Sequence, residues 1–146
     1  MNDSSATGVL VRLTASVTFP RGITITAFPG DSDIGTTGDT EVASSEMGVN
    51  GDLIWWKTAQ GVEAQVPVNP NSLDDTLLDK LYQANRVSKS RSAKKDIITL
   101  VVMNPVTGIP KTYKNGIITS GPVGYQYGGD GRIKSRVYQF IFEEAV

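Results

Sequence analysis

The sequence predicts a mainly β protein: a two-sheet β-sandwich or barrel with one flanking α-helix. Three observations support this prediction. Apolar and polar residues alternate over several short segments, residues typical of turns separate those segments, and one segment alone has helical spacing. The 146 residues suffice for a single domain with a core, so we expect residues 1–146 to form one domain.

The first strand is expected from Val9 to Phe19, where every second residue is apolar. Pro20-Arg21-Gly22 should end this strand, and Ile23, Ile25 and Ala27 mark a second one. The following segment, Asp31 to Asp39, is polar and rich in glycine, which is typical of a loop.

A β-hairpin is expected next. Its strands are Thr40 to Gly48 and Asp52 to Thr58, and Asn50-Gly51 favours a two-residue type I′ turn between them. A short turn at Gln60-Gly61 then leads to an alternating strand from Val62 to Val68.

The helix should begin after Ser72 and end near Asn85. Ser72 is a good N-cap, and Asp75 three residues later completes a capping pattern that Asp74 supports electrostatically. The apolar stripe has helical spacing and consists of Leu73, Leu77, Leu78, Leu81 and Tyr82.

Three further strands are expected at Ile97 to Met103, within Lys111 to Ser120, and at Ile133 to Glu143. The last one has two apolar faces, so one face should belong to the core and the other should be covered by the helix or another subunit. We expect the aromatic face, Tyr138, Phe140 and Phe142, to pack on the helix stripe of Leu73, Leu77 and Leu81.

Composition narrows the function classes. The chain has no cysteine and no histidine, and its net charge is −1. Thiol chemistry and the commonest general base and metal ligand are therefore excluded, and no cofactor and no enzymatic activity are expected. No apolar run is long enough for a membrane anchor, and the polar start, Met1 to Gly8, is unlike a signal peptide, so synthesis in a host cytoplasm is expected.

The glycine-rich stretch from Gly128 to Arg132 is expected to be a hairpin turn, because a strand follows it where a phosphate-binding loop needs a helix. Acidic residues at 31 and 33 lack the third ligand of an EF-hand calcium loop.

Several residues are candidates for contacts with another chain. Trp55 and Trp56 are adjacent in a strand, so one can enter the core while the other faces outward or meets a partner. The segment from Arg86 to Lys95 is strongly basic and suits a solvated loop, a phosphate contact or an acidic patch of a neighbouring copy. The candidate contact residues are Asp31, Asp33, Asp39, Trp55, Trp56, Arg86, Lys89 and Arg91.

The order of motifs resembles the tail tube proteins of contractile-tailed phages and related prophage particles. The resemblance covers roughly residues 9 to 145. It includes the hairpin from Met47 to Asp52, the runs GVEAQVPV, NPNSLDDTLLDKLY and DIITLVVMNPVTG, and the block from Asn115 to Ala145 with its glycine-rich turn, aromatic strand and acidic close.

The resemblance implies a structural subunit of the virion tail. Its copies would form hexameric rings that stack into a tube, DNA would pass through without specific binding, and sheath and baseplate proteins would be further partners. The polar loop of Asp31, Asp33 and Asp39 would then stack one ring on the next. Two alternatives stay open: a monomeric β-sandwich that binds carbohydrate through Trp55 or Trp56, and a hydrolase that uses carboxylates alone.

Overall fold

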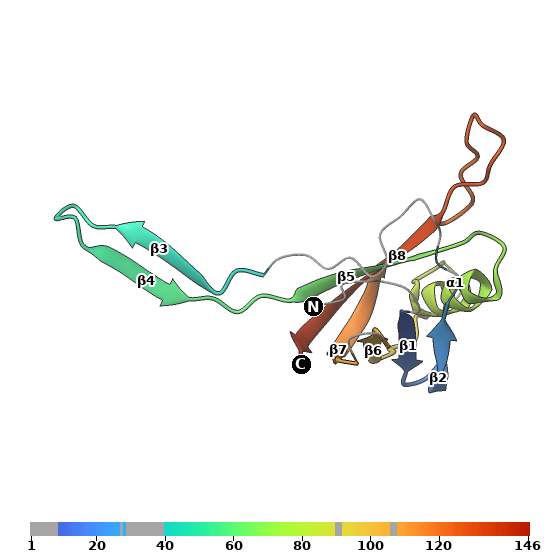
Figure 1. The fold of residues 1–146 in the computed structure, drawn as a ribbon, viewed down its shortest axis with the longest axis horizontal. Coiled ribbons are helices and arrows are strands. Elements are labelled where there is room, and N and C mark those ends of the chain that lie inside the picture. The colour runs from blue at the N-terminus through green and yellow to red at the C-terminus, as the bar shows by residue number, and fades with distance from the viewer. Residues whose placement is uncertain (1–8, 27, 29–39, 90–91, 106–107) are drawn as a thin grey trace.

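The computed structural model describes residues 9–26, 28, 40–89, 92–105 and 108–146. Eight strands and one helix lie within these residues (Figure 1). In chain order they are β1 (Leu10–Ala15), β2 (Phe19–Ile25), β3 (Ala43–Met47), β4 (Leu53–Lys57), β5 (Val62–Val68), α1 (Leu73–Asn85), β6 (Ile98–Met103), β7 (Pro110–Ser120) and β8 (Arg136–Ala145).

Two sheets are present, as the sequence predicts. Six strands form an antiparallel sheet in the order β2-β1-β6-β7-β8-β5, and β3 and β4 form a two-stranded sheet of their own. The six-stranded sheet is not closed into a barrel, because β2 and β5 stand at its two edges. Figure 1 shows the β3–β4 hairpin extending away from the rest of the molecule, which we call the body.

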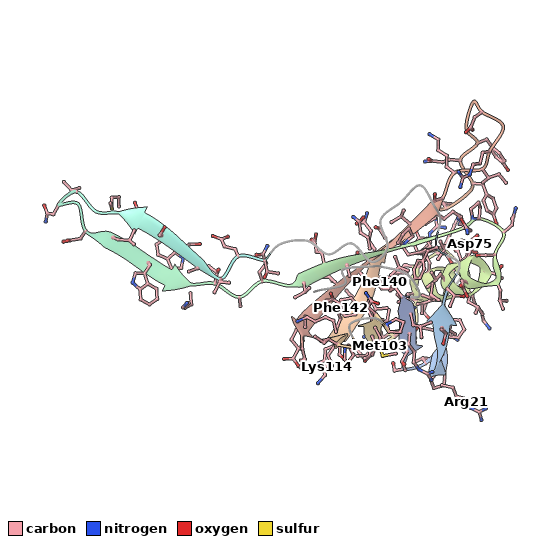
Figure 2. All side chains as sticks on the ribbon, in the orientation of Figure 1. Arg21, Asp75, Met103, Lys114, Phe140 and Phe142 are labelled. Carbon is pink, nitrogen blue, oxygen red and sulfur yellow. The ribbon has the colours of Figure 1, made fainter. Side chains whose placement is uncertain are left out.

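The core lies between α1 and one face of the six-stranded sheet. Alternate residues of β1, β5, β6 and β8 point to this face, and Leu78 and Leu81 of α1 close it from the other side. Tyr138, Phe140 and Phe142 are all buried in this core, and Figure 2 labels the two phenylalanines. Tyr138 contacts α1 through the Tyr82 ring and the Asp75 carboxylate, so the expected packing of the aromatic face on the helix is confirmed at Tyr138.

The helix stripe itself is shifted from the prediction. Leu73 is 74% exposed, whereas Asp74, Asp75, Leu78 and Leu81 are buried. Periodicity alone favoured the leucines, but the first turn of α1 turns two carboxylates toward the sheet. Their hydrogen-bond partners on the sheet, described below, make this burial possible.

The N-terminal strand is shorter than predicted. β1 ends at Ala15, and a turn at residues 16–18 leads into β2, so Pro20-Arg21-Gly22 lies inside a strand. The edge position of β2 explains this tolerance, because an edge strand has no neighbour on its outer side and can accommodate proline. Gly22 has a φ of 80°, which places the kink at the residue that accepts it most readily.

Asp96 joins the turn at residues 16–18 to the end of the helix. Its buried carboxylate accepts hydrogen bonds from the backbone N–H groups of Val17 and Thr18, at 2.8 and 2.9 Å, and from the Thr18 hydroxyl at 2.6 Å. Asn85 of α1 donates a further bond of 2.7 Å and accepts one from the Asp96 N–H. Burial alone raises the pKa of the Asp96 carboxyl, but the bonds from Thr18, Asn85 and Val17 together outweigh it and hold the pKa below its ordinary value.

The Asn115-Gly116 dipeptide forms a bulge within a long strand. Asn115 has a φ of 53°, and the pairing of β7 with β6 shifts register between Ile98 and Leu100. A Cβ at position 116 would overlap the ring of Phe142 on β8, so this position requires glycine for space as well.

Within the described part of the chain, no helix is long and apolar enough to cross a bilayer.

Candidate functional site

The β3–β4 hairpin, which we call the arm (residues 42–58), forms by local pairing alone. Ala43 pairs with Lys57 at its base and Met47 pairs with Leu53 near its tip. The expected hairpin is confirmed, but the expected type I′ turn is wrong. Gly48 and Asp52 close a three-residue loop in which Gly51 alone has a positive φ, at 83°.

Neither tryptophan of the arm enters a core. Trp55 is 61% exposed and Trp56 is 47% exposed, and as neighbours in β4 they point to opposite faces of the hairpin. The sequence prediction that one of them is buried is wrong, since no described part of the body covers either face of the arm. The ammonium of Lys57 lies 5.7 Å from the Trp55 ring centroid, close enough for a cation–π contact.

The exposed apolar surface of the arm involves both strands and the tip. Even a two-stranded hairpin with good cross-strand pairs is marginally stable in water without further packing. The large exposed apolar side chains are Val42, Met47, Val49, Leu53, Ile54, Trp55 and Trp56. Such a surface is typical of a segment that another chain covers.

A second site is a buried ion pair where β8 begins. The Arg136 guanidinium donates to both carboxylate oxygens of Asp75 at 3.0 Å, and the Tyr138 hydroxyl donates to the same carboxylate at 3.0 Å. The Asp75 and Arg136 side chains are 1% and 5% exposed. The role of Asp75 therefore goes beyond the predicted cap: Ser72 does accept from the Asp75 N–H, while the Asp75 carboxylate ties α1 to β8.

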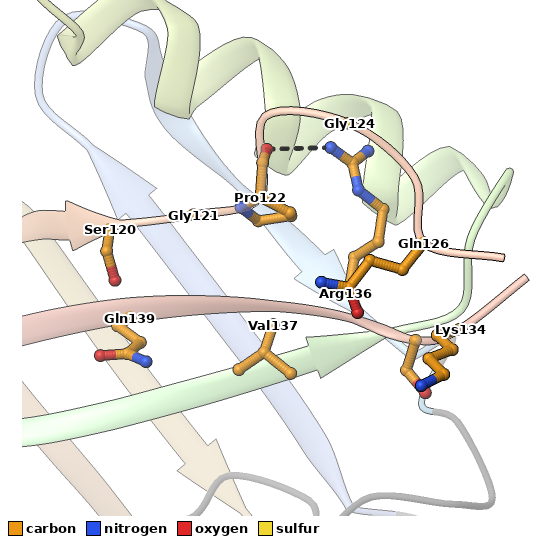
Figure 3. Close-up of a pocket in the computed structure, with 10 residues that line it drawn as sticks. Ser120, Gly121, Pro122, Gly124, Gln126, Lys134, Arg136, Val137 and Gln139 are labelled. Atoms are coloured by element: carbon orange, nitrogen blue, oxygen red, sulfur yellow. Dashed lines mark hydrogen bonds between the residues drawn. The ribbon is translucent and has the colours of Figure 1, made fainter. Parts of the chain in front are cut away.

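Arg136 also holds the chain that leads away from β7. It donates to the Pro122 carbonyl at 3.1 Å, which Figure 3 shows, and its guanidinium lies 4.7 Å from the Tyr125 ring centroid. Burial lowers the pKa of Arg136, but the hydrogen bond to Asp75 and the surrounding negative charge outweigh burial, so the pKa is raised and the side chain stays charged. Burial also raises the pKa of the Tyr138 hydroxyl far above its ordinary value, with Asp75 adding to the effect.

Sequence reasoning missed the role of Arg136, although a signal existed. Arg136 has the same strand parity as Tyr138, Phe140 and Phe142, so an alternating pattern places it on the core face. A buried arginine needs a carboxylate partner. Asp74, the other buried acid of this turn of α1, accepts a hydrogen bond of 2.8 Å from the Thr26 N–H beyond β2.

A cavity of about 310 Å³ lies where β7 and β8 separate (Figure 3). It is lined by residues from the end of β7 and from the start of β8 with the segments next to them: Ser120, Gly121, Pro122, Gly124, Gln126, Lys134, Ser135, Arg136, Val137 and Gln139. No carboxylate lines it, so it offers no acid–base pair of the kind that glycoside hydrolysis uses. The expected turn at Gly128 to Arg132 is confirmed: the Gly128 N–H donates to the Arg132 carbonyl, and Gly131 has a φ of 82°.

The predicted contact residues are not gathered at one place. Trp55 and Trp56 lie on the arm, while Arg86 and Lys89 lie exposed at the end of α1. Four candidates, Asp31, Asp33, Asp39 and Arg91, lie outside the described residues. Among the residues that the structure describes, no three acidic side chains come together as a metal-binding group.

Comparison with known proteins gives one family match. The model of the family described as "Tail fiber protein gp32" matches residues 2–146. A search of curated proteins finds no match.

Two solved structures align with the whole chain at low sequence identity. A chain in the cryo-EM structure of the anti-feeding prophage baseplate, 6-fold symmetrised, aligns with a TM-score of 0.60 at 13% identity, covering 100% of this chain and 95% of that one. A chain in the cryo-EM structure of the anti-feeding prophage cap, which terminates the tube, aligns at 9% identity with a TM-score of 0.49, covering 100% of this chain and 91% of that one. The first of these likenesses shows a common fold.

Proposed function

Because this chain belongs to the tail fiber protein gp32 family of phage tail proteins, we propose that it is a structural subunit whose copies assemble into rings and stack into a tail tube. The resemblance to tail proteins noted in the sequence is confirmed at the level of the phage tail. The tube itself, its six-membered rings and the absence of enzymatic activity are the part that we propose.

The arm is the observation that supports this proposal most directly. Its apolar side chains are exposed on both faces, and a free two-stranded hairpin gains little stability in water. Another chain that covers Trp55 and Trp56 would remove a large apolar area from water, at roughly 25 cal/mol per Å² of area buried. A subunit that projects such an arm is suited to permanent assembly.

The sheet offers the second contact. β2 and β5 each have one side without a partner strand in the described structure, and unpaired edges readily accept another strand. An edge of one copy against the opposite edge of the next is a head-to-tail contact, which closes into a ring when the rotation between copies fits. The solved baseplate chain of like fold comes from a structure described as 6-fold symmetrised, which agrees with a six-membered ring.

The face of the sheet opposite α1 fits the wall of a channel. Val137 and Ile141 are half-buried and Gln139 is exposed on this face of β8, and exposed Arg12, Glu63 and Glu143 give the face charges of both signs, so it carries no concentrated positive charge. A wall without concentrated positive charge would not bind the DNA phosphates strongly, so DNA could pass through the channel. The basic residues Arg86 and Lys89 follow α1, which packs on the other face, so they should lie away from the channel.

Removal of the arm tests the proposal. The Thr58 N–H donates to the Val42 carbonyl at 3.1 Å, so the two ends of the arm are already adjacent and a short Gly-Ser linker can replace residues 43–57. Core residues stay untouched, and the variant should match the parent in far-UV circular dichroism of the body and in cooperative unfolding. The parent should form rings or tubes in negative-stain microscopy, and the variant should stay monomeric in light scattering.

A matched control keeps the arm and removes its apolar surface. Changing Leu53, Ile54, Trp55 and Trp56 to threonine retains strand-forming residues and should abolish assembly as the deletion does. A parent protein that is monomeric at every concentration would contradict the proposal. Specific binding of an oligosaccharide by that monomer, lost on Trp55→Thr or Trp56→Thr, would favour the carbohydrate-binding alternative.

A further inference from the structure

Hydrogen bonds fix part of the basic segment that follows α1 against the end of the helix. The Lys94 N–H donates to the Ala84 carbonyl at 2.9 Å, and Asn85 and Asp96 exchange hydrogen bonds, so residues 94–96 lie back against the last turn of the helix. The sequence suggested a solvated loop for this segment. The bonds at Lys94 and Asp96 instead place its described C-terminal part beside α1.

The end of α1 and the segment that follows it carry a concentrated positive surface, which we call the basic surface. Between residues 80 and 95 the described part of the chain contains five cationic residues and no acidic one, and all five are exposed: Lys80, Arg86, Lys89, Lys94 and Lys95. α1 has no basic residue in its last turn, but its C-cap residue Arg86 places a cation next to the negative end of the helix dipole.

A cavity lies within the basic surface. Its volume is about 290 Å³, and it is lined by Lys80, Gln83, Ala84, Ser92 and Lys94. Lysine side chains have apolar stems beneath their ammonium groups, so such a hollow suits a flat apolar group with cations at its rim. Tryptophan is the best acceptor of a cation among the aromatic residues.

The arm carries the complementary chemistry. Glu41 at its base, Glu46 and Asp52 are exposed, and Lys57 is the one cation between residues 40 and 58, which gives −3 + 1 = −2 for this segment. Both indoles are exposed on the same hairpin. Figure 1 shows the arm and α1 on different sides of the body, with the arm pointing away, so the two surfaces of one chain do not meet.

We propose that the arm of one copy docks on the basic surface of another copy, with an indole of Trp55 or Trp56 in the 290 Å³ cavity and the arm carboxylates against the lysines. This inference rests on the proposed self-assembly and names the partner surface of the arm. The contact is heterologous, since arm and acceptor are different surfaces, so each copy can give one arm and receive another.

Charge reversal is the first test. Lys94→Glu with Lys95→Glu should raise the protein concentration needed for assembly about tenfold, because two attractive contacts become repulsive. Glu46→Lys with Asp52→Lys should do the same, and an equal mixture of the two variants should assemble better than either alone. Lys111→Glu, an exposed charge at the far end of β7, should leave assembly unchanged.

Zero-length cross-linking tests the contact independently of tubes. A mixture of ¹⁴N- and ¹⁵N-labelled protein is treated with a carbodiimide, which joins lysine amines to carboxylates in contact. Mixed-isotope cross-links between the arm (Glu46 or Asp52) and the basic surface (Lys80, Lys94 or Lys95) would support the docking.

The outcomes separate the two proposals. Rings or tubes whose mixed-isotope cross-links lie elsewhere, with assembly unaffected by the reversals, would refute the docking and leave the proposed function intact. Arm-to-basic-surface cross-links in pairs that never form rings would support the docking and contradict the tube. A monomer without mixed-isotope cross-links refutes both, and if its basic surface instead binds an acidic tail protein, that protein is the partner.

Discussion

Arg136→Met removes the cation that neutralises Asp75 inside the protein. Both side chains are almost fully buried, and two bonds of 3.0 Å join them. Removing one partner of a buried ion pair typically costs about 3–5 kcal/mol, because the remaining charge is left in a poorly polarisable environment. Tyr138 still donates to Asp75, so we expect a loss of about 3 kcal/mol in the free energy of unfolding.

The double variant Asp75→Leu, Arg136→Met should be more stable than Arg136→Met alone, since it leaves no unpaired charge. It also deprives the buried Tyr138 hydroxyl of its acceptor, at a cost of about 1–3 kcal/mol. Adding Tyr138→Phe should recover much of that cost. The coupling between positions 75 and 136 is then expected at about 2–3 kcal/mol.

Urea unfolding followed by far-UV circular dichroism measures these differences under two-state conditions. Arm-deleted protein provides the background, so that self-association does not contribute to the apparent stability. A loss below about 1 kcal/mol for Arg136→Met, or additive single and double variants, would show that the pair is solvated and does not hold α1 to β8.

Three further variants test the body of the fold. Phe140→Ala should lower the free energy of unfolding by about 3–5 kcal/mol and abolish assembly through loss of folding. A variant that unfolds like the parent yet stays monomeric in light scattering would place the aromatic face at an interface. The pKa of Asp96 is lowered in the fold, so its carboxylate stabilises the fold above the unfolded pKa of about 3.9, and this contribution is lost as the pH falls below that value. Asp96→Asn should therefore be less stable than the parent at pH 7 but lose less stability on acidification. Parallel pH profiles of stability for the two proteins would contradict this. Gly116→Ala should cost about 1–3 kcal/mol by overlap with Phe142, and Phe142→Leu in the same chain should relieve part of that loss; an unchanged melting temperature for Gly116→Ala would refute the overlap.

Alternation along the chain was sufficient to predict the strand from Val62 to Val68 and the buried face of the last strand. Tyr138, Phe140 and Phe142 lie two residues apart, and the sheet buries all three. Ser72 was enough to locate the start of α1, because its capping bond is local. Such features depend on residues close in sequence, which is why a single sequence contains them.

The features that escaped prediction depend on residues far apart in the chain. Asp75 and Arg136 meet only because α1 crosses the start of β8, 61 residues later. Asp96 binds Thr18 across 78 residues and thereby ends β1 earlier than alternation suggested. The exposure of Trp55 and Trp56 depends on the arm standing clear of the body, which no local pattern encodes.

The chain has two tryptophans, and both lie on the arm. Intrinsic indole fluorescence therefore reports on the surroundings of the arm, whereas the buried Tyr113 and Tyr138 belong to the body. A shift of indole emission to shorter wavelength without a change in the tyrosine signal would mark the moment when an arm leaves water. Tryptophan and tyrosine fluorescence thus report separately on association and on unfolding, and the kinetics of association can be followed without an attached dye.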